Sequence, residues 1–172
     1  MNIDIPTEGD WFSWPATAVR PMDLDENYAR RRFLGKSFEE ALRLFRETAV
    51  LGCSEDVSCM PPVPFRYYML VYNAHVLSEG ECERTDYGDA PDGASSFLSL
   101  IEHKLEVDAK TIAPIMNDLM PTVEFVGINQ EKYDADIDIY GDFLVKARRI
   151  KELWNAHPNN PANANLRRRF VL

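Results

Sequence analysis

The chain has 172 residues, of which 45% are hydrophobic, 11% aromatic and 27% charged, and its net charge is −9. This composition is typical of a globular protein with a sizeable core. The absence of a run of 18 apolar residues excludes a membrane-spanning helix, and the N-terminal M-N-I-D-I-P lacks the features of a secretory signal, so we expect a cytoplasmic protein.

The negative charge is unevenly distributed along the chain. Residues 1–145 carry 27 acids and 12 Lys/Arg, a net charge of −15, whereas residues 146–172 carry one acid and 7 Lys/Arg, a net charge of +6. An acidic body disfavours binding to nucleic acid, because phosphates need a basic surface. It favours association with a basic protein, although acidity that only keeps a protein soluble produces the same pattern.

The N-terminal segment D-W-F-S-W-P, residues 10–15, concentrates Trp11, Phe12 and Trp14 outside any periodic stretch. We expect these aromatic residues to form an arm that packs across the domain and fills a gap in its core. The alternative is an exposed anchor that contacts a partner or a second copy of the chain.

The tripeptide Gly35-Lys36-Ser37 matches the end of a phosphate-binding loop. The preceding residues 27–32 are neither glycine-rich nor strand-like, as such a loop requires. Ser37 instead begins S-F-E-E, a capping box in which the side chains of Ser37 and Glu40 accept from each other's backbone amides. Apolar residues then recur at helical spacing, so residues 37–50 are predicted to form an amphipathic helix.

The next segment, S-E-D-V-S-C-M-P-P-V-P, is predicted to be a loop closed by three prolines, with Pro64 as the first residue of a helix over about residues 64–78. The expected buried stripe of that helix comprises Phe65, Tyr68, Met69, Tyr72 and Val76.

Residues 33–68, which contain F-L-G-K-S-F-E-E-A-L-R-L-F-R-E and M-P-P-V-P-F-R-Y-Y, resemble a group of bacterial proteins without an established activity. That group shares a G-K-[ST]-x-E-E-A-x-x-L-F-R-E helix, an E-D loop and an M-x-P-V-x-F-R-Y-Y helix start. The resemblance implies that Glu55, Asp56, Arg66 and Tyr67 belong to one local unit, in which Arg66 pairs with Glu55 or Asp56 across the proline-rich turn.

The segment that follows, residues 78–92, is rich in glycine and acids and lacks periodicity, which predicts a long loop. A tyrosine among carboxylates is a common arrangement at protein interfaces, so this loop is the candidate docking site for a basic partner. Acidic loops are also often only solvated. The predicted partner-binding residues are Glu79, Glu81, Glu83, Asp86, Tyr87, Asp89 and Asp92.

The C-terminal half is predicted to contain three further helices. Ser95 or Ser96 caps one that ends near Val107, and Asp108 caps another that Pro121 stops. The stretch T-V-E-F-V-G-I, residues 122–128, is either a strand or an irregular turn. A longer helix is expected over about residues 131–156, and a Pro/Asn-rich basic tail without regular structure over residues 158–172.

No group of residues has the pattern of a metal or catalytic site. His75, His103 and His157 lack the spacing of zinc ligands. Cys53, Cys59 and Cys82 lack CxxC spacing and are expected to be reduced thiols, and no G-x-S-x-G elbow occurs.

The segment D-A-D-I-D-I-Y-G-D, residues 134–142, resembles the start of a calcium loop, but Ile139 and Val145 stand where that loop needs Gly and Glu. We interpret it as the acidic first turn of a helix, with Ile137, Ile139 and Tyr140 buried. The sequence therefore predicts no cofactor and no metal.

These patterns predict a mainly α, single-domain irregular bundle of about five helices with long loops, over residues 1–157. The favoured function is non-enzymatic: binding of a basic, toxin-like protein, as an immunity-type inhibitor of a bacterial toxin does. One alternative is a general interaction module that forms homodimers through Trp11, Phe12 and Trp14. Another is an enzyme of unrecognised class that uses carboxylates near Arg66. Neither nucleic acid nor a membrane is an expected partner.

Overall fold

The computed structural model describes residues 4–12, 23–81, 89–161 and 163. Every regular element in this part of the chain is helical, as predicted. Seven α-helices have nine or more residues, rather than the predicted five or so: α1 (Leu24–Phe33), α2 (Phe38–Glu47), α3 (Val50–Ser58), α4 (Pro62–Glu81), α5 (Ala90–Val107), α7 (Met116–Ile128) and α9 (Phe143–Ala156). Short helices complete the fold: η1 (Glu8–Phe12), α6 (Ala109–Ile112), η3 (Ala113–Ile115), η4 (Gln130–Tyr133) and α8 (Ile137–Tyr140).

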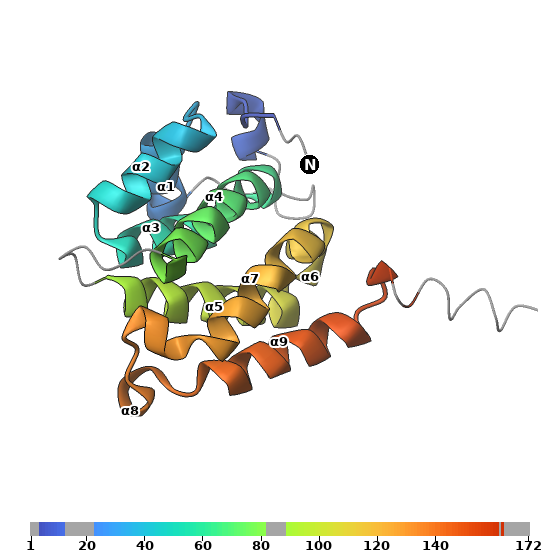
Figure 1. The fold of residues 1–172 in the computed structure, drawn as a ribbon. Helices are drawn as coiled ribbons and strands as arrows, with labels where there is room; N and C mark the ends of the chain where they lie inside the picture. The colour runs from blue at the N-terminus through green and yellow to red at the C-terminus, as the bar shows by residue number, and fades with distance from the viewer. Residues whose placement is uncertain (1–3, 13–22, 82–88, 162, 164–172) are drawn as a thin grey trace, which may run out of the picture.

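The helix α4 lies in the middle of the molecule. On one side it meets η1, α2 and α3, and on the other it meets α5 and α7, with α9 covering α5 and α7 from below (Figure 1). The side chains of Tyr68 and Tyr72 lie in the core, and their hydroxyls form hydrogen bonds there. The hydroxyl of Tyr68 donates to the carbonyl of Phe33, and that of Tyr72 donates to the carbonyl of Gly93 at 2.7 Å. Each buried hydroxyl is thereby satisfied, which a polar group in a core requires.

The predicted capping box at the start of α2 is confirmed. The backbone amide of Glu40 donates to Ser37 Oγ at 3.3 Å, and the amide of Ser37 donates to the Glu40 carboxylate at 2.9 Å. The Gly35-Lys36-Ser37 tripeptide is thus a helix start. A second capping box, between Asp23 and Glu26, begins α1, a helix that the sequence analysis missed.

Two predicted helix boundaries in the N-terminal half are wrong. The expected loop after Gly52 is instead the helix α3, and α4 begins at Pro62 rather than Pro64. Only Cys59, Met60 and Pro61 separate these helices. The face of α3 that carries Cys53 and Val57 is fully buried, so tertiary packing stabilises a segment whose own sequence pattern favours a loop.

The C-terminal half departs further from the predictions. The helix α4 continues to Glu81 and the helix α5 begins at Ala90, before Ser95 and Ser96, so residues 78–81 and 90–92 of the expected acidic loop are helical. Pro121 does not stop a helix but lies inside α7, and residues 122–128 are helical rather than a strand or a turn. Burial of Val123 and Val126 along α7 outweighs the hydrogen bond that Pro121 cannot donate.

The single helix expected over residues 131–156 is also wrong, because it is divided into η4, α8 and α9. Asp134 and Gly141 have left-handed backbones, with φ of 53° and 74°, which interrupt helical hydrogen bonding. Asp136 and Asp142 then act as the N-caps of α8 and α9. The predicted acidic helix start is therefore present, but it starts a single turn.

The tail begins with ordered residues. Asn160 is buried, and its side-chain amide donates to the carbonyl of Trp154 at 3.1 Å. The side chain of Asn163 donates to the carbonyl of Asn155 at 2.7 Å, so this residue lies at the C-terminal end of α9. Within the described ranges, no helix is both long and apolar enough to cross a membrane.

Candidate functional site

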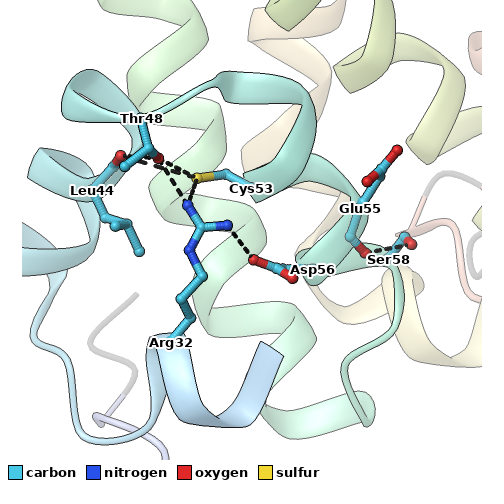
Figure 2. A network of polar contacts seen from close by, with 7 residues as sticks. All are labelled: Arg32, Leu44, Thr48, Cys53, Glu55, Asp56 and Ser58. Atoms are coloured by element: carbon cyan, nitrogen blue, oxygen red, sulfur yellow. Dashed lines mark hydrogen bonds and ion pairs between the residues drawn. The ribbon is translucent and has the colours of Figure 1, made fainter. Parts of the chain in front are cut away.

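A polar network joins the first three helices around the guanidinium of Arg32 (Figure 2). From α1, Arg32 donates to the Asp56 carboxylate at 2.5 Å, to Thr48 Oγ1 at 2.8 Å and to Cys53 Sγ at 3.2 Å. Thr48 Oγ1 also donates to the carbonyl of Leu44 at 2.8 Å. Arg32 therefore holds the end of α2 and one face of α3 against α1.

The pKa shifts of Cys53 and Asp56 indicate that this network has a structural role. Burial raises the pKa of the Cys53 thiol, and the hydrogen bond between Cys53 and Thr48 and the charge of Arg32 only partly oppose that rise. Burial also raises the pKa of Asp56, against the opposing effect of Arg32. Cys53 is fully buried and stays a thiol at neutral pH, whereas a reactive cysteine needs an exposed thiolate.

The predicted unit of Glu55, Asp56, Arg66 and Tyr67 does not form the expected ion pair. Asp56 pairs with Arg32 instead of Arg66, and Glu55 points away from that pair on the other side of α3 (Figure 2). Within the described part of the chain, no ion pair of Arg66 is present. Tyr67 is buried, and burial raises its pKa, against a hydrogen bond from the backbone of Phe38.

The residues predicted to bind a partner divide into three groups. Glu79, Asp89 and Asp92 lie at the end of α4 and the start of α5. Glu81 is the last residue of α4, and its side chain is outside the described set. Outside the described residues altogether lie Glu83, Asp86 and Tyr87.

The described acids of this loop approach one another and approach α8. Burial raises the pKa of Glu79, the charge of Arg46 opposes that rise, and the charge of Asp89 adds to it. Asp92 accepts a hydrogen bond from the hydroxyl of Tyr140, the last residue of α8. The ends of the predicted docking loop and the single turn of α8 therefore lie at one end of the molecule.

Sequence reasoning missed the exposure of α8. It predicted buried isoleucines, but Ile137 is 55% exposed and Ile139 is 74% exposed. Asp136 and Asp138 are exposed beside them. In Figure 1 this turn projects from the N-terminal end of α9, away from the core. The two aspartates that precede α8 were a visible signal, since such residues cap short helices in turns.

His75 on α4 is a buried polar residue with an unsatisfied ring nitrogen. Its imidazole stacks on the ring of Phe45 with 5.6 Å between centroids, and its Nδ1 atom is buried without a hydrogen-bond partner. Burial, together with the charge of Arg46 and against the charge of Asp89, lowers the pKa of His75 to about 4. His75 is therefore a neutral core residue at pH 7, whereas His103 is exposed and His157 half-buried.

The N-terminal aromatic residues have different environments. Trp11 is fully buried, and its ring lies 6.3 Å from that of Tyr68, which agrees with the expected packing of this arm. Phe12 is 61% exposed, and the guanidinium of Arg30 lies 5.3 Å from its ring centroid. Trp14 lies outside the described residues.

No group of three or more His, Cys, Asp or Glu side chains among the described residues has the geometry to hold a metal ion. Asp136, from the calcium-like segment, accepts from the amide of Asp138 at 2.8 Å and so acts as a helix cap.

Comparison with protein-family models, with curated proteins and with solved structures found no match for this chain. The resemblance of residues 33–68 to a group of bacterial proteins therefore stays a prediction, and the function is inferred from the residues and contacts described above.

Proposed function

We propose that the protein is a non-enzymatic binder of a basic protein and uses the acidic end of the molecule, defined as Glu79, Asp89, Asp92, Asp136 and Asp138. The observation that supports this proposal is the gathering of these carboxylates by two separate segments. The ends of α4 and α5 supply the first three, and α8, joined to Asp92 through Tyr140, supplies the others.

The charge of this end favours a basic partner over an acidic or a neutral one. Arg46 lies near Glu79, and the lysines that flank α8 along the chain lie over aromatic rings of their own molecule: Lys132 over Phe125 and Lys146 over Phe143. The acids are mostly exposed, so they attract an approaching cationic surface and accelerate association, especially at low salt.

The finer proposal is an immunity-type inhibitor that blocks a basic bacterial toxin. An inhibitor of this kind acts by occupying a surface and needs no reactive group of its own. The enzyme alternative gains little from the contacts around Arg66, because Asp56 is already paired with Arg32. Self-association through the aromatic arm has less support, because Trp11 is fully buried and so is not exposed to a second copy.

The test is capture of proteins from a lysate of the native host by the tagged full-length chain, with elution by a salt gradient and mass spectrometry. The expected result is one basic polypeptide, bound at 1:1 stoichiometry and released at high salt. Asp89→Lys should weaken its binding, and Glu39→Lys on α2, whose carboxylate is exposed elsewhere, serves as the matched control. Equal effects of the two variants, or no stoichiometric basic protein, would contradict the proposal.

The inhibitor proposal has its own readout. Expression of the captured partner alone should inhibit growth, and co-expression with this protein should restore it. If co-expression did not relieve the growth inhibition, the protein would bind its partner without inhibiting it, and the inhibitor proposal would be wrong.

A further inference from the structure

The corner of the molecule around α8 carries exposed aliphatic residues as well as acids. Ile128 ends α7, Ile137 and Ile139 lie on α8, and Val145 lies in the first turn of α9; each is between 55% and 74% exposed. Among them stand exposed acids, which include Glu131, Asp136 and Asp138. We call residues 128–145 the acidic-apolar corner. Several exposed aliphatic residues within one short segment are typical of a surface that binds a protein.

The corner is held in a fixed shape by polar side chains as well as by the buried Tyr133 and Phe143. The Nε2 amide of Gln130 donates to the carbonyls of Ala135 at 3.0 Å and Gly141 at 2.9 Å, on either side of α8. Its Oε1 accepts from the amide of Phe143 at 2.9 Å. Gln130 thus clamps both ends of the segment that presents Ile137 and Ile139. A rigid presentation loses little conformational entropy on binding, which favours a role in recognition.

The same chain contains a segment of complementary chemistry. Residues 166–172 read L-R-R-R-F-V-L, three consecutive arginines between apolar side chains. The arginines match the carboxylates of the corner, and Leu166, Phe170 and Val171 match its isoleucines. This pairing of charge and apolar surface points to the basic segment as the occupant of the corner.

Within one copy, the corner precedes α9 and the basic segment follows it, so the length of α9 lies between them. The corner lies at the N-terminal end of α9, whereas Asn163 lies at its C-terminal end. A helix of 14 residues spans about 21 Å. Arg167 to Arg169 follow Asn163 by four to six residues, which reach at most about 14–22 Å when fully extended. A contact within one copy therefore requires a tail that is fully stretched along α9, whereas a second copy can approach the corner from any direction.

We propose that the basic segment 166–172 of one molecule binds the acidic-apolar corner of a second copy, so that the protein associates head to tail. Such a contact uses different surfaces on the two molecules and leaves each with one free surface, so it builds chains or closes into rings. The proposal goes beyond binding of a basic partner. It also implies competition, because the segment covers acids at the end of the molecule offered to that partner.

The first measurement is sedimentation equilibrium of the full-length protein over a concentration series. We expect an average mass that rises with concentration and falls with salt. Loss of about three exposed ion pairs corresponds to about a tenfold weaker association in high salt. A fluorescent peptide of residues 164–172 should bind the protein with a similar salt dependence, and a peptide with the three arginines replaced by glutamine should not.

Two sets of variants locate the contact. The corner variant Ile139→Ser/Asp138→Lys removes one exposed isoleucine and one exposed acid, so it should fold normally but stay monomeric. Val107→Ser/Asp118→Lys is the matched control, because both residues are exposed away from the corner. The tail variant replaces Arg167, Arg168 and Arg169 by Glu and should also be monomeric.

Complementation then tests the head-to-tail arrangement. A mixture of the corner variant with the tail variant should form 1:1 dimers, because one retains the basic segment and the other retains the corner. A wild-type protein that stays monomeric and does not bind the peptide would overturn the proposal. Self-association that the corner variant does not change would also overturn it. Capture of a basic partner by a monomeric protein would leave the proposed function intact.

Discussion

The buried histidine of α4 predicts a specific loss of stability in mild acid. His75 is 5% exposed, stacks on Phe45, and faces Arg46 from α2, Asp89 at the start of α5 and Glu79 on its own helix. None of these contacts favours the imidazolium enough to overcome burial, and the pKa falls to about 4 from an ordinary value of 6.5. Replacement by phenylalanine keeps an aromatic ring against Phe45 and removes the titrating group.

The sign and size of the effect follow from proton linkage. Between pH 6.5 and pH 4 the unfolded chain binds a proton at His75 and the folded protein does not, so stability falls as the pH is lowered through this range. The full difference corresponds to about 3 kcal/mol below pH 4. Between pH 7 and pH 5 the wild-type protein should lose about 2 kcal/mol of unfolding free energy through His75 alone.

Urea unfolding at pH 7 and pH 5 measures this term. Carboxylates also titrate in this range, so the informative quantity is the difference between wild type and His75→Phe at each pH. That difference should move by about 2 kcal/mol in favour of the variant at pH 5. His103→Phe on α5 is the control, because His103 is exposed and its removal should leave the pH dependence unchanged. A His75→Phe protein that loses as much stability as wild type would refute the reasoning.

Other substitutions test the packing of the fold by the same unfolding measurement at pH 7. Arg32→Met should cost about 2–4 kcal/mol because it leaves a buried carboxylate unpaired, whereas Arg149→Ala, which breaks exposed ion pairs, should cost at most about 1 kcal/mol. Gly127→Ala should cost about 1–3 kcal/mol, since the added Cβ would lie 2.6 Å from that of Ala147 where α7 crosses α9. Ser37→Ala should cost about 1 kcal/mol through loss of the cap of α2, and no change would mean that this cap is not needed.

Local signals in the sequence were sufficient where a few adjacent residues decide the structure. The S-F-E-E box predicted the start of α2, because both hydrogen bonds of that box lie within four residues. The stripe of Phe65, Tyr68 and Tyr72 predicted the core face of α4 for a similar reason, since helical spacing is a local property.

Signals for helix breaks were less reliable because packing overrides them. Pro121 lies inside α7, and the proline-rich segment expected to be a loop is mostly helical. Conversely, the helical spacing around Ile137 and Tyr140 continues across a real break, because Asp134 and Gly141 adopt left-handed backbones there. Aspartate and glycine near one another were the available evidence for that break.

The candidate site depended on contacts between residues that are distant in sequence. Sequence reasoning expected Arg66 to pair with Glu55 or Asp56, about ten positions away, whereas the partner of Asp56 is Arg32, twenty-four positions away on the other side. No local pattern identifies that pair. The burial of His75 was more accessible, because it lies three residues after Tyr72 and next to Val76 on the same helical stripe.

In the acidic-apolar corner, the residues proposed to bind a partner differ from the residues that stabilise the core. Most apolar residues at helical spacing in the described chain are buried, and burial stabilises the helix that carries them. The two isoleucines of α8 are instead exposed. Asp136 caps the turn, Gln130 holds its two ends, and the buried Tyr133 and Phe143 anchor the chain on either side, so the exposed isoleucines contribute little to folding. Residues that folding does not need are free to be selected for what they contact, which is why this turn carries both proposals for binding.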